Sequence, residues 1–299
     1  MSLTAPVLTA LAEAGLDATD VEALARSAVA EDLAGGVDVT STATVPATLC
    51  GTAAFVSREV GIVAGIGIAM AVLDVVGEVE VLSRVADGLA VTPGQPVLEV
   101  RGAVRDLLTA ERSALNLLCH LSGVATLTRR WVDAVEGTGA RIRDTRKTTP
   151  GLRVLEKYAV RAGGGVNHRM SLSDAALVKD NHVVAAGGVA KAFAAVRASY
   201  PDLEVEVECD TVAQVREVIA AGADLVLLDN MSLEDLRASV ALCRAADVLT
   251  EASGGLHLDT ARVVAETGVD YLAVGALTHS APVLDIGVDL ALAPTEGTA

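Results

Sequence analysis

Apolar residues at helical spacing in the first forty positions predict two short helices. Gly15 ends the first helix, since glycine readily adopts the left-handed conformation that closes a helix. Asp17 or Thr19 caps the second, which runs to about Leu33 before a glycine pair breaks it. The chain is therefore expected to begin with a helical hairpin.

The pattern then changes to a period of two. Apolar and polar residues alternate over 51–59, 78–84 and 96–102, which predicts half-buried strands, and a helix is predicted over 66–76. A long helical pattern follows from Val104 to Glu136, and Gly123 within it leaves a kink or a division of the helix open. The alternating segment 283–292 is expected to return to the sheet that these strands form.

From Arg141 onwards, short strand patterns alternate with helix patterns. Six apolar strand segments recur at intervals of roughly 20 to 30 residues, which indicates parallel strands. This number of units favours an α/β barrel over a doubly wound sheet, and no GxGxxG motif follows the first strand as a dinucleotide-binding sheet would require. The expected domains are 1–122, joined by the C-terminal segment 281–299, and a barrel over 123–280.

Composition limits the function classes. The 299 residues are 52% hydrophobic but only 2% aromatic, so Ala, Val, Leu and Ile must build the core. Mean hydropathy is +0.47. The longest apolar run, 61–73, is nevertheless too short and too rich in glycine to span a membrane. A net charge of −16 argues against a nucleic-acid partner.

The four cysteines, Cys50, Cys119, Cys209 and Cys243, show no CxxC spacing. This spacing indicates neither a zinc site nor a redox pair. The start of the chain lacks the basic region of a secretion signal. Reduced thiols and a cytoplasmic location are therefore expected.

Positive charge is concentrated in residues 141–179. Nine of the 23 basic residues lie there with three acidic ones, so this segment carries +6 and the rest of the chain −22. Arg153, Lys157 and Arg161 are spaced four apart and fit a solvated helix face. Arg146 and Lys147, like Lys179, instead end strand patterns, where barrels build their active sites. A small polyanionic substrate is the expected ligand.

Other candidate ligands also end strand patterns or follow glycines. Glu208 and Asp229 could hold a divalent ion, accept hydrogen bonds from ribose hydroxyls, or form salt bridges to the cations. Residues 253–255 and 274–276 end the last two patterns, where glycines allow backbone N–H groups to approach a phosphate or make an ordinary turn. His168 and Arg169 follow three glycines and indicate a carboxylate clamp. His120, His182 and His257 are interpreted as structural.

The central block 144–182, DTRKTTPGLRVLEKYAVRAGGGVNHRMSLSDAALVKDNH, resembles the signature of the quinolinate phosphoribosyltransferases. Further segments match that family in order: EDLAGGVDVTS at 31–41, ERSALN at 111–116, EVEVEC at 204–209, LLDNM at 227–231, EASGG at 251–255 and VGALTHSAP at 274–282. The resemblance implies an N-terminal α/β sandwich domain and an open seven-stranded α/β barrel. It also implies a homodimer, or a hexamer of such dimers, in which the partner covers each barrel mouth.

The resemblance implies a role for each site residue. Lys147, Glu208 and Asp229 would be catalytic. Quinolinate would be bound by Arg112 of the partner subunit and by Thr145, Arg146, Lys147, His168, Arg169 and Lys179. Phosphoribosyl pyrophosphate (PRPP) would be bound by Lys147, Lys179, Glu208, Asp229, Ser253, Gly254, Gly255, Val274, Gly275, Ala276 and His279. Mg²⁺ is the expected cofactor, held directly or indirectly by Glu208 and Asp229.

The expected reaction transfers phosphoribosyl from PRPP to quinolinate with decarboxylation, in NAD biosynthesis. One alternative is an accessory homologue, associated with molybdenum transport, that binds small anions without transferring a group. Retention of Arg112, Arg146 and Arg169 argues against it. A nicotinate-specific transferase is the other alternative, and its substrate has only one carboxylate for so large a cationic clamp. Neither a nucleic acid nor a membrane is expected as a partner.

Overall fold

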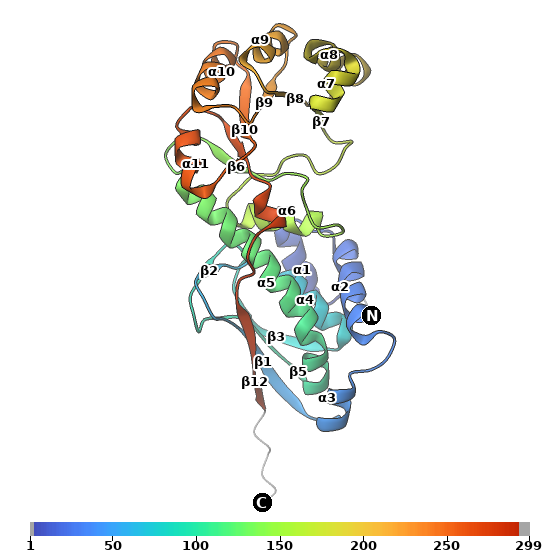
Figure 1. Ribbon diagram of the computed structural model, residues 1–299. Helices are drawn as coiled ribbons and strands as arrows, with labels where there is room; N and C mark the ends of the chain where they lie inside the picture. Colours follow the sequence, from blue (N-terminus) through green and yellow to red (C-terminus); the bar gives the residue numbers. More distant parts are fainter. Residues whose placement is uncertain (1–2, 293–299) are drawn as a thin grey trace, which may run out of the picture. The chain divides into compact units, whose positions relative to one another are not determined.

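The computed structural model describes residues 3–292, which form two compact units of mixed α/β structure (Figure 1). Unit 1 contains the described residues up to Leu127, residues 154–163 and the described residues from Ala281 onwards. Unit 2 contains 128–153 and 164–280. Whereas the sequence pattern divided the chain at 122/123, these units divide it five residues later and assign 154–163 to the first.

Unit 1 is built on a four-stranded antiparallel sheet in the order β12-β1-β5-β3. Its elements are α1 (Ala5–Ala14), α2 (Ala18–Leu33), α3 (Val39–Thr44), β1 (Cys50–Ser57), β2 (Gly61–Ile62), α4 (Ile66–Val76), β3 (Val79–Arg84), β4 (Ala90–Val91), β5 (Pro96–Ala103), most of α5 (Val104–Ala134), nearly all of α6 (Arg153–Ala162) and β12 (Ile286–Leu292). The predicted return of the C-terminal segment is confirmed, because β12 pairs with β1 from Ile286↔Ser57 to Leu292↔Gly51.

The predicted helical hairpin is also confirmed. Gly15 closes α1 in the left-handed conformation, with φ 65°. The cap of α2 is Asp17, whose carboxylate accepts hydrogen bonds from the backbone N–H groups of Thr19 and Asp20. That helix ends at Leu33, as the pattern predicted.

Helix α5 runs through Gly123 without division. A side chain at this position would meet the backbone of Pro282 and Val283, with a Cβ only 2.9 Å from Val283 Cα. The glycine therefore serves close packing of two chain segments. At 31 residues α5 is the longest helix, yet within residues 3–292 no helix has both the length and the apolar character of a membrane span.

The prediction of a solvated face on α6 is wrong for Lys157. This lysine is fully buried, and so is the neighbouring Glu156. Leu155 to Val160 are all buried, whereas Val154 and Arg161 near the two ends are exposed, so the middle of the helix is covered on every side. The spacing of Arg153, Lys157 and Arg161 could not reveal this, because a buried ion-bearing helix and a solvated one share the same pattern.

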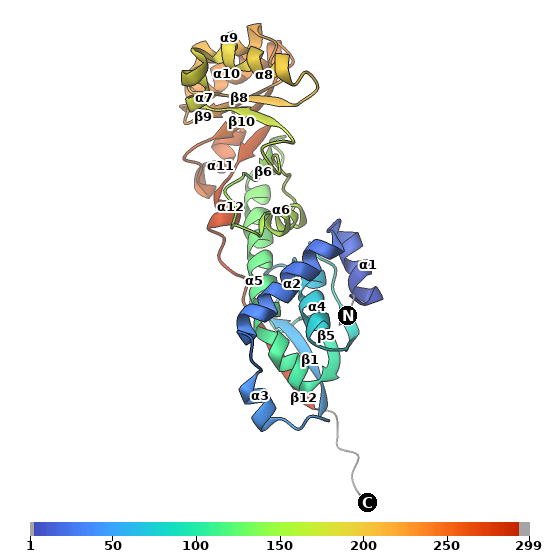
Figure 2. The ribbon, with the colours of Figure 1, turned by 90° about the vertical axis from the view of Figure 1, so that its right-hand side faces the viewer.

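Unit 2 is built on a parallel six-stranded sheet in the order β6-β11-β10-β9-β8-β7. Figure 2 shows strands β8, β9 and β10 of this sheet with helices of the same unit beside them. Its elements are β6 (Arg141–Arg143), β7 (Ala176–Val178), α7 (Asp180–Ala186), α8 (Val189–Ser199), β8 (Val205–Cys209), α9 (Val212–Ala220), β9 (Leu225–Asp229), α10 (Leu233–Ala245), β10 (Leu249–Ser253), α11 (Leu258–Ala265), β11 (Tyr271–Ala273) and α12 (Ala276–His279). The arrangement fits the expected α/β barrel.

The seventh strand implied by the family resemblance is reduced to a single bridge among the described residues. Val166 pairs in parallel with Arg143 on the free side of β6. Glycines at 163–165 precede it, and glycine is a poor strand former because it loses much conformational entropy. The barrel is therefore open between this bridge and β7, which ends the other side of the sheet.

Gly123→Ala tests the close packing on α5. Alanine favours an isolated helix by about 1 kcal/mol over glycine. The clash with the backbone of Pro282 should outweigh that gain, so the free energy of unfolding should fall by about 1–3 kcal/mol, measured by urea denaturation. Asn116→Ala, at an exposed position of the same helix, is the control and should change stability by less than about 0.5 kcal/mol. Equal stability of wild type and Gly123→Ala would contradict the packing role.

Candidate active site

A cavity of about 490 Å³ lies at the carboxyl-terminal ends of the strands of unit 2. Parallel pairing brings these ends to one edge of the sheet, where barrel enzymes have their active sites. The predicted site residues that line the cavity are Thr145, Arg146, Lys147, His168, Arg169, Lys179, Glu208, Asp229 and Ser253. The structure therefore brings together most of the residues that the sequence singled out.

One face of the sheet supplies the strand residues of this cavity. In the β8–β9–β10 ladder Glu208 pairs with Leu227 and Leu227 with Glu251, so these three side chains project from the same face. All three line the cavity. Residues of the opposite parity, such as Val207 and Leu228, are completely buried. The alternation in these strands thus separates a charged face from an apolar one.

Two arginines that line the cavity, Arg146 and Arg169, could bind an anion. Arg146 Nε is buried and has no hydrogen-bond partner in the part of the chain that the structure describes. The pKa of Arg169 is lowered by burial and by repulsion from Arg146. Two guanidinium groups that repel each other, one of them with an unused donor at Arg146 Nε, would be stabilised by a bound carboxylate or phosphate.

Local contacts fix the loop that carries Lys147. Its backbone N–H donates to Thr145 Oγ1 at 3.0 Å, and its carbonyl accepts a hydrogen bond from Thr278 Oγ1 at 2.8 Å. A Cβ on Gly275 would lie 2.9 Å from Lys147 Cδ and 3.3 Å from His279 Nε2. Gly275 therefore leaves the space in which the lysine stem passes the start of α12.

The acidic side of the cavity could hold a divalent cation. Oxygen atoms of Glu208, Asp210 and Asp229 lie within 4.8 Å of one another. Burial and repulsion from Asp229 raise the pKa of Glu208. The protein alone therefore stabilises the ionised form of this carboxyl poorly. Mg²⁺ prefers carboxylate oxygens of this kind. Sequence analysis missed Asp210, which directly follows the strand and could have been found as a third acid after Glu208.

The glycine segments flank the cavity and do not line it. Gly254 and Gly255 have φ values of 82° and 58°, and a side chain on Gly254 would collide with the Asn230 amide. Val274 is buried and donates its N–H to the carbonyl of Arg143. Of the other predicted phosphate ligands, Gly275, Ala276 and His279 lie at the start of or within α12.

Two groups of residues interpreted from the sequence do not line this cavity: Arg112, which the resemblance assigns to the site of the partner subunit, and the three histidines with predicted structural roles. Arg112 is exposed on α5 in unit 1. The three histidines assigned structural roles have local partners or positions: His120 contacts Glu156 at 2.8 Å, His182 Nδ1 accepts the backbone N–H of Lys179, and His257 precedes α11.

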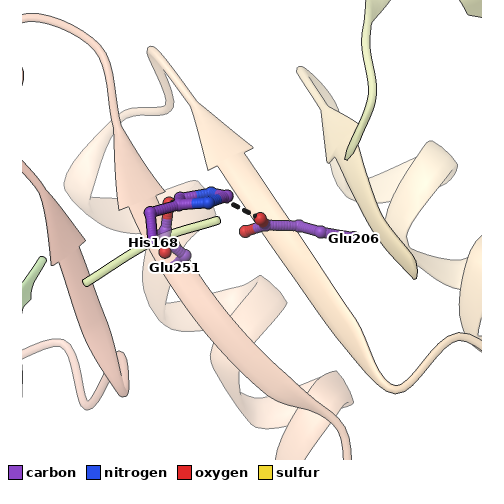
Figure 3. A group of neighbouring side chains, drawn as sticks. All are labelled: His168, Glu206 and Glu251. Atoms are coloured by element: carbon purple, nitrogen blue, oxygen red, sulfur yellow. Dashed lines mark ion pairs between the residues drawn. The ribbon is translucent and has the colours of Figure 1, made fainter. Parts of the chain in front are cut away.

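A buried group of charged residues adjoins the cavity, and of its members only His168 was predicted from the sequence as a site residue (Figure 3). His168 Nε2 lies 2.8 Å from Glu206 Oε2 and 3.6 Å from Glu251 Oε1. Arg143 Nη1 donates to Glu251 Oε2 at 2.8 Å. Burial raises the pKa of Glu206 and of Glu251 to about 7. The alternation in β8 puts Glu206 on the same face as Glu208, but it does not indicate that Glu206 is buried.

Two protein-family models match this chain, and they meet near the predicted domain boundary at 122/123. The family model for the N-terminal domain of quinolinate phosphoribosyl transferase matches residues 38–122, and that for its C-terminal domain matches 124–289. A Mycobacterium leprae protein named nicotinate-nucleotide pyrophosphorylase (carboxylating) is 56% identical, covering 89% of this chain and 95% of that one. A mitochondrial quinolinate phosphoribosyltransferase (decarboxylating) from Nicotiana tabacum is 40% identical, covering 91% and 82%.

Solved structures agree. A crystal structure of NadC from Streptococcus pyogenes is 39% identical and superimposes with a TM-score of 0.89, covering 93% of this chain and 99% of that one. The resemblance found in the sequence is therefore confirmed over almost the whole chain.

The raised pKa of Glu251 predicts a pH dependence of stability. The carboxyl is ionised above about pH 4.5 in the unfolded chain but holds its proton up to about pH 7 in the folded protein, chiefly because it is buried. The folded protein therefore binds more protons in this window, and the free energy of unfolding contributed by Glu251 falls as the pH rises through it.

Glu251→Gln has no such proton to lose. The stability of wild type minus that of Glu251→Gln, from urea denaturation at several pH values, should decline from about pH 4.5 to about pH 7. A difference that is constant across this range would contradict the raised pKa.

Proposed function

The chain belongs to the quinolinate phosphoribosyltransferase family, and from this membership we propose how its cavity binds the two substrates and promotes the reaction. The protein is a pentosyltransferase of pyridine nucleotide biosynthesis. It transfers phosphoribosyl from PRPP to quinolinate with decarboxylation, which gives nicotinate mononucleotide, pyrophosphate and CO₂.

The observation that carries the binding proposal is that cations and carboxylates line one cavity. Arg146, Arg169 and Lys179 line it together with Glu208 and Asp229. Quinolinate has two carboxylates, and guanidinium groups bind carboxylates in a bidentate manner. We assign Arg146, Arg169 and Lys179 to these carboxylates, with Thr145 beside them.

PRPP would lie on the acidic side. Glu208 and Asp229 would accept hydrogen bonds from the ribose hydroxyls and would hold Mg²⁺, with Asp210 as a further oxygen donor. The bound ion would neutralise charge on the leaving pyrophosphate. Ser253 and the glycine segments around Gly254 and Gly275 would surround the 5′-phosphate, and His279 would be near it. Val274 would contribute packing, because its N–H is already donated to a carbonyl.

The chemistry requires positioning more than a reactive side chain. The pyridine nitrogen of quinolinate attacks ribose C1 as pyrophosphate departs, and positive charge develops on the sugar. Carboxylates near the sugar favour this charge, and Lys147 between the two sites favours the departing anion. The N-ribosyl pyridinium then accepts the electron pair released when the 2-carboxylate leaves as CO₂. Holding two anions in one orientation supplies much of the acceleration.

A second copy of the chain is part of this proposal. Arg112 is exposed on unit 1 and would enter the quinolinate site of a partner subunit, in a homodimer or a hexamer of dimers. The four cysteines are free, which supports a reducing compartment such as the cytoplasm.

The proposed function is tested by release of labelled CO₂ from carboxyl-labelled quinolinate. PRPP and Mg²⁺ are supplied together and then omitted one at a time. In a competition control, nicotinate is added beside the labelled quinolinate. Release that requires PRPP and Mg²⁺, without competition by nicotinate, is expected. Binding of quinolinate without release would contradict the transferase and favour an anion-binding accessory protein.

The two adjacent cations should have separable effects. Arg146→Ala should raise the KM of quinolinate about tenfold to a hundredfold, since it removes one charge-assisted interaction with a carboxylate. Lys147→Ala should mainly lower kcat, by about a hundredfold or more. Arg141→Ala, at an exposed position on strand β6, which precedes the loop of Arg146 and Lys147, is the control and should change neither. An unchanged KM in Arg146→Ala would disprove its assignment.

The acids should determine the need for metal. Glu208→Gln removes one charge from the group of carboxylates, so a higher Mg²⁺ concentration should be needed for half-maximal rate and kcat/KM for PRPP should fall about tenfold or more. Glu217→Gln, an exposed acid on α9, is the matched control. If the Mg²⁺ requirement of Glu208→Gln equals that of wild type, this carboxylate does not hold the ion.

A further inference from the structure

His168 lies in the wall of the cavity, yet both nitrogens of its ring are occupied by the protein (Figure 3). Nδ1 accepts a hydrogen bond from the backbone N–H of Arg169, with a nitrogen–nitrogen distance of 2.7 Å. A ring nitrogen that accepts an N–H carries no proton of its own. The contact therefore assigns the ring proton to Nε2 and makes the imidazole neutral.

The surroundings of Nε2 do not suit an anionic ligand. This atom lies 2.8 Å from Glu206 Oε2 and 3.6 Å from Glu251 Oε1. The two glutamates are only 2% and 0% exposed. A substrate carboxylate that approached Nε2 would be brought beside two buried carboxyl groups whose ionisation is already unfavourable, which costs free energy.

We propose that His168 is a positioning residue, whose neutral ring lies against Glu206 and Glu251 at Nε2 and fixes the backbone of Arg169 through Nδ1. Of this His–Arg pair, Arg169 contacts the substrate carboxylate. The inference changes the role that the family resemblance implied for His168, and it rests on the proposed quinolinate site.

Further contacts hold the same segment. The backbone N–H of His168 donates to Asp144 Oδ1 at 2.8 Å. Arg143 pairs with Glu251 at 2.8 Å, which fixes that carboxylate. At the other end, Arg169 Nη1 donates to the carbonyl of Ala175 at 2.9 Å.

Side chains from β6, β8 and β10 therefore surround the His168 ring and the short segment that carries it. Such restraint would place the Arg169 guanidinium before substrate arrives and reduce the entropy lost on binding.

The state of the His168 ring can be measured in the wild-type protein. The chain has five histidines, so ¹⁵N labelling of histidine gives a simple spectrum. His168→Gln assigns the signal, or, if that variant does not fold, substitution of the other four assigns it by elimination. We expect one pyridine-type nitrogen and one pyrrole-type nitrogen, unchanged when quinolinate is added. Protonation of both nitrogens, with or without quinolinate, would overturn the proposal.

A mutant cycle tests whether Glu206 acts through Arg169. Glu206→Gln should raise the Kd and the KM of quinolinate about tenfold, the size of one lost polar contact, while the KM of PRPP changes less than about twofold. In an Arg169→Ala background the same substitution should change the Kd no further, because the two residues act in series. Glu204→Gln, an exposed neighbour near β8, is the control. Additive effects would contradict the positioning role.

Calorimetry separates failure of this inference from failure of the proposed function. If wild-type protein does not bind quinolinate, the substrate site is wrong and the inference falls with it. If quinolinate binds and the His168 ring is then an imidazolium, only the positioning role is wrong. A merely structural Glu206 would lower the Tm of Glu206→Gln without selectively changing quinolinate affinity.

Discussion

Parallel pairing makes the strands β6 to β11 of unit 2 end at one edge, and the charged groups of the cavity lie at or near that edge. Residues far apart in sequence, such as Arg146 and Asp229, therefore become neighbours without any direct chain connection. Alternation along each strand sends the charged residues to one face and leaves the other apolar. An enzyme that must hold two anions can thus build its site on a rigid sheet.

The charged groups at this edge include some that are buried, and their burial costs free energy. Glu206 and Glu251 are buried where ionisation is unfavourable, and Arg143 and His168 are their nearest partners. A buried pair of this kind contributes little net stability, since desolvation opposes the attraction. The presence of these buried residues is better explained by the position that His168 gives to Arg169.

Much of this could be read from the sequence, for physical reasons. Alternating βα units require parallel strands, and cations that end strand patterns, such as Arg146 and Lys179, must then share an edge. Burial was harder to predict. Lys157 lies in the covered middle of its helix, and Glu206 shares its strand face with the more accessible Glu208. Both depend on what packs against them, which local spacing does not contain. Gly123 was noted as a possible kink, but its role comes from the distant backbone of Pro282.

The position of bound quinolinate in a crystal structure of the complex tests the central claim most directly. The account predicts both carboxylates within hydrogen-bond distance of Arg146, Arg169 or Lys179, with His168 Nδ1 still on the backbone N–H of Arg169. A carboxylate on His168 Nε2, or quinolinate bound outside this cavity, would contradict it.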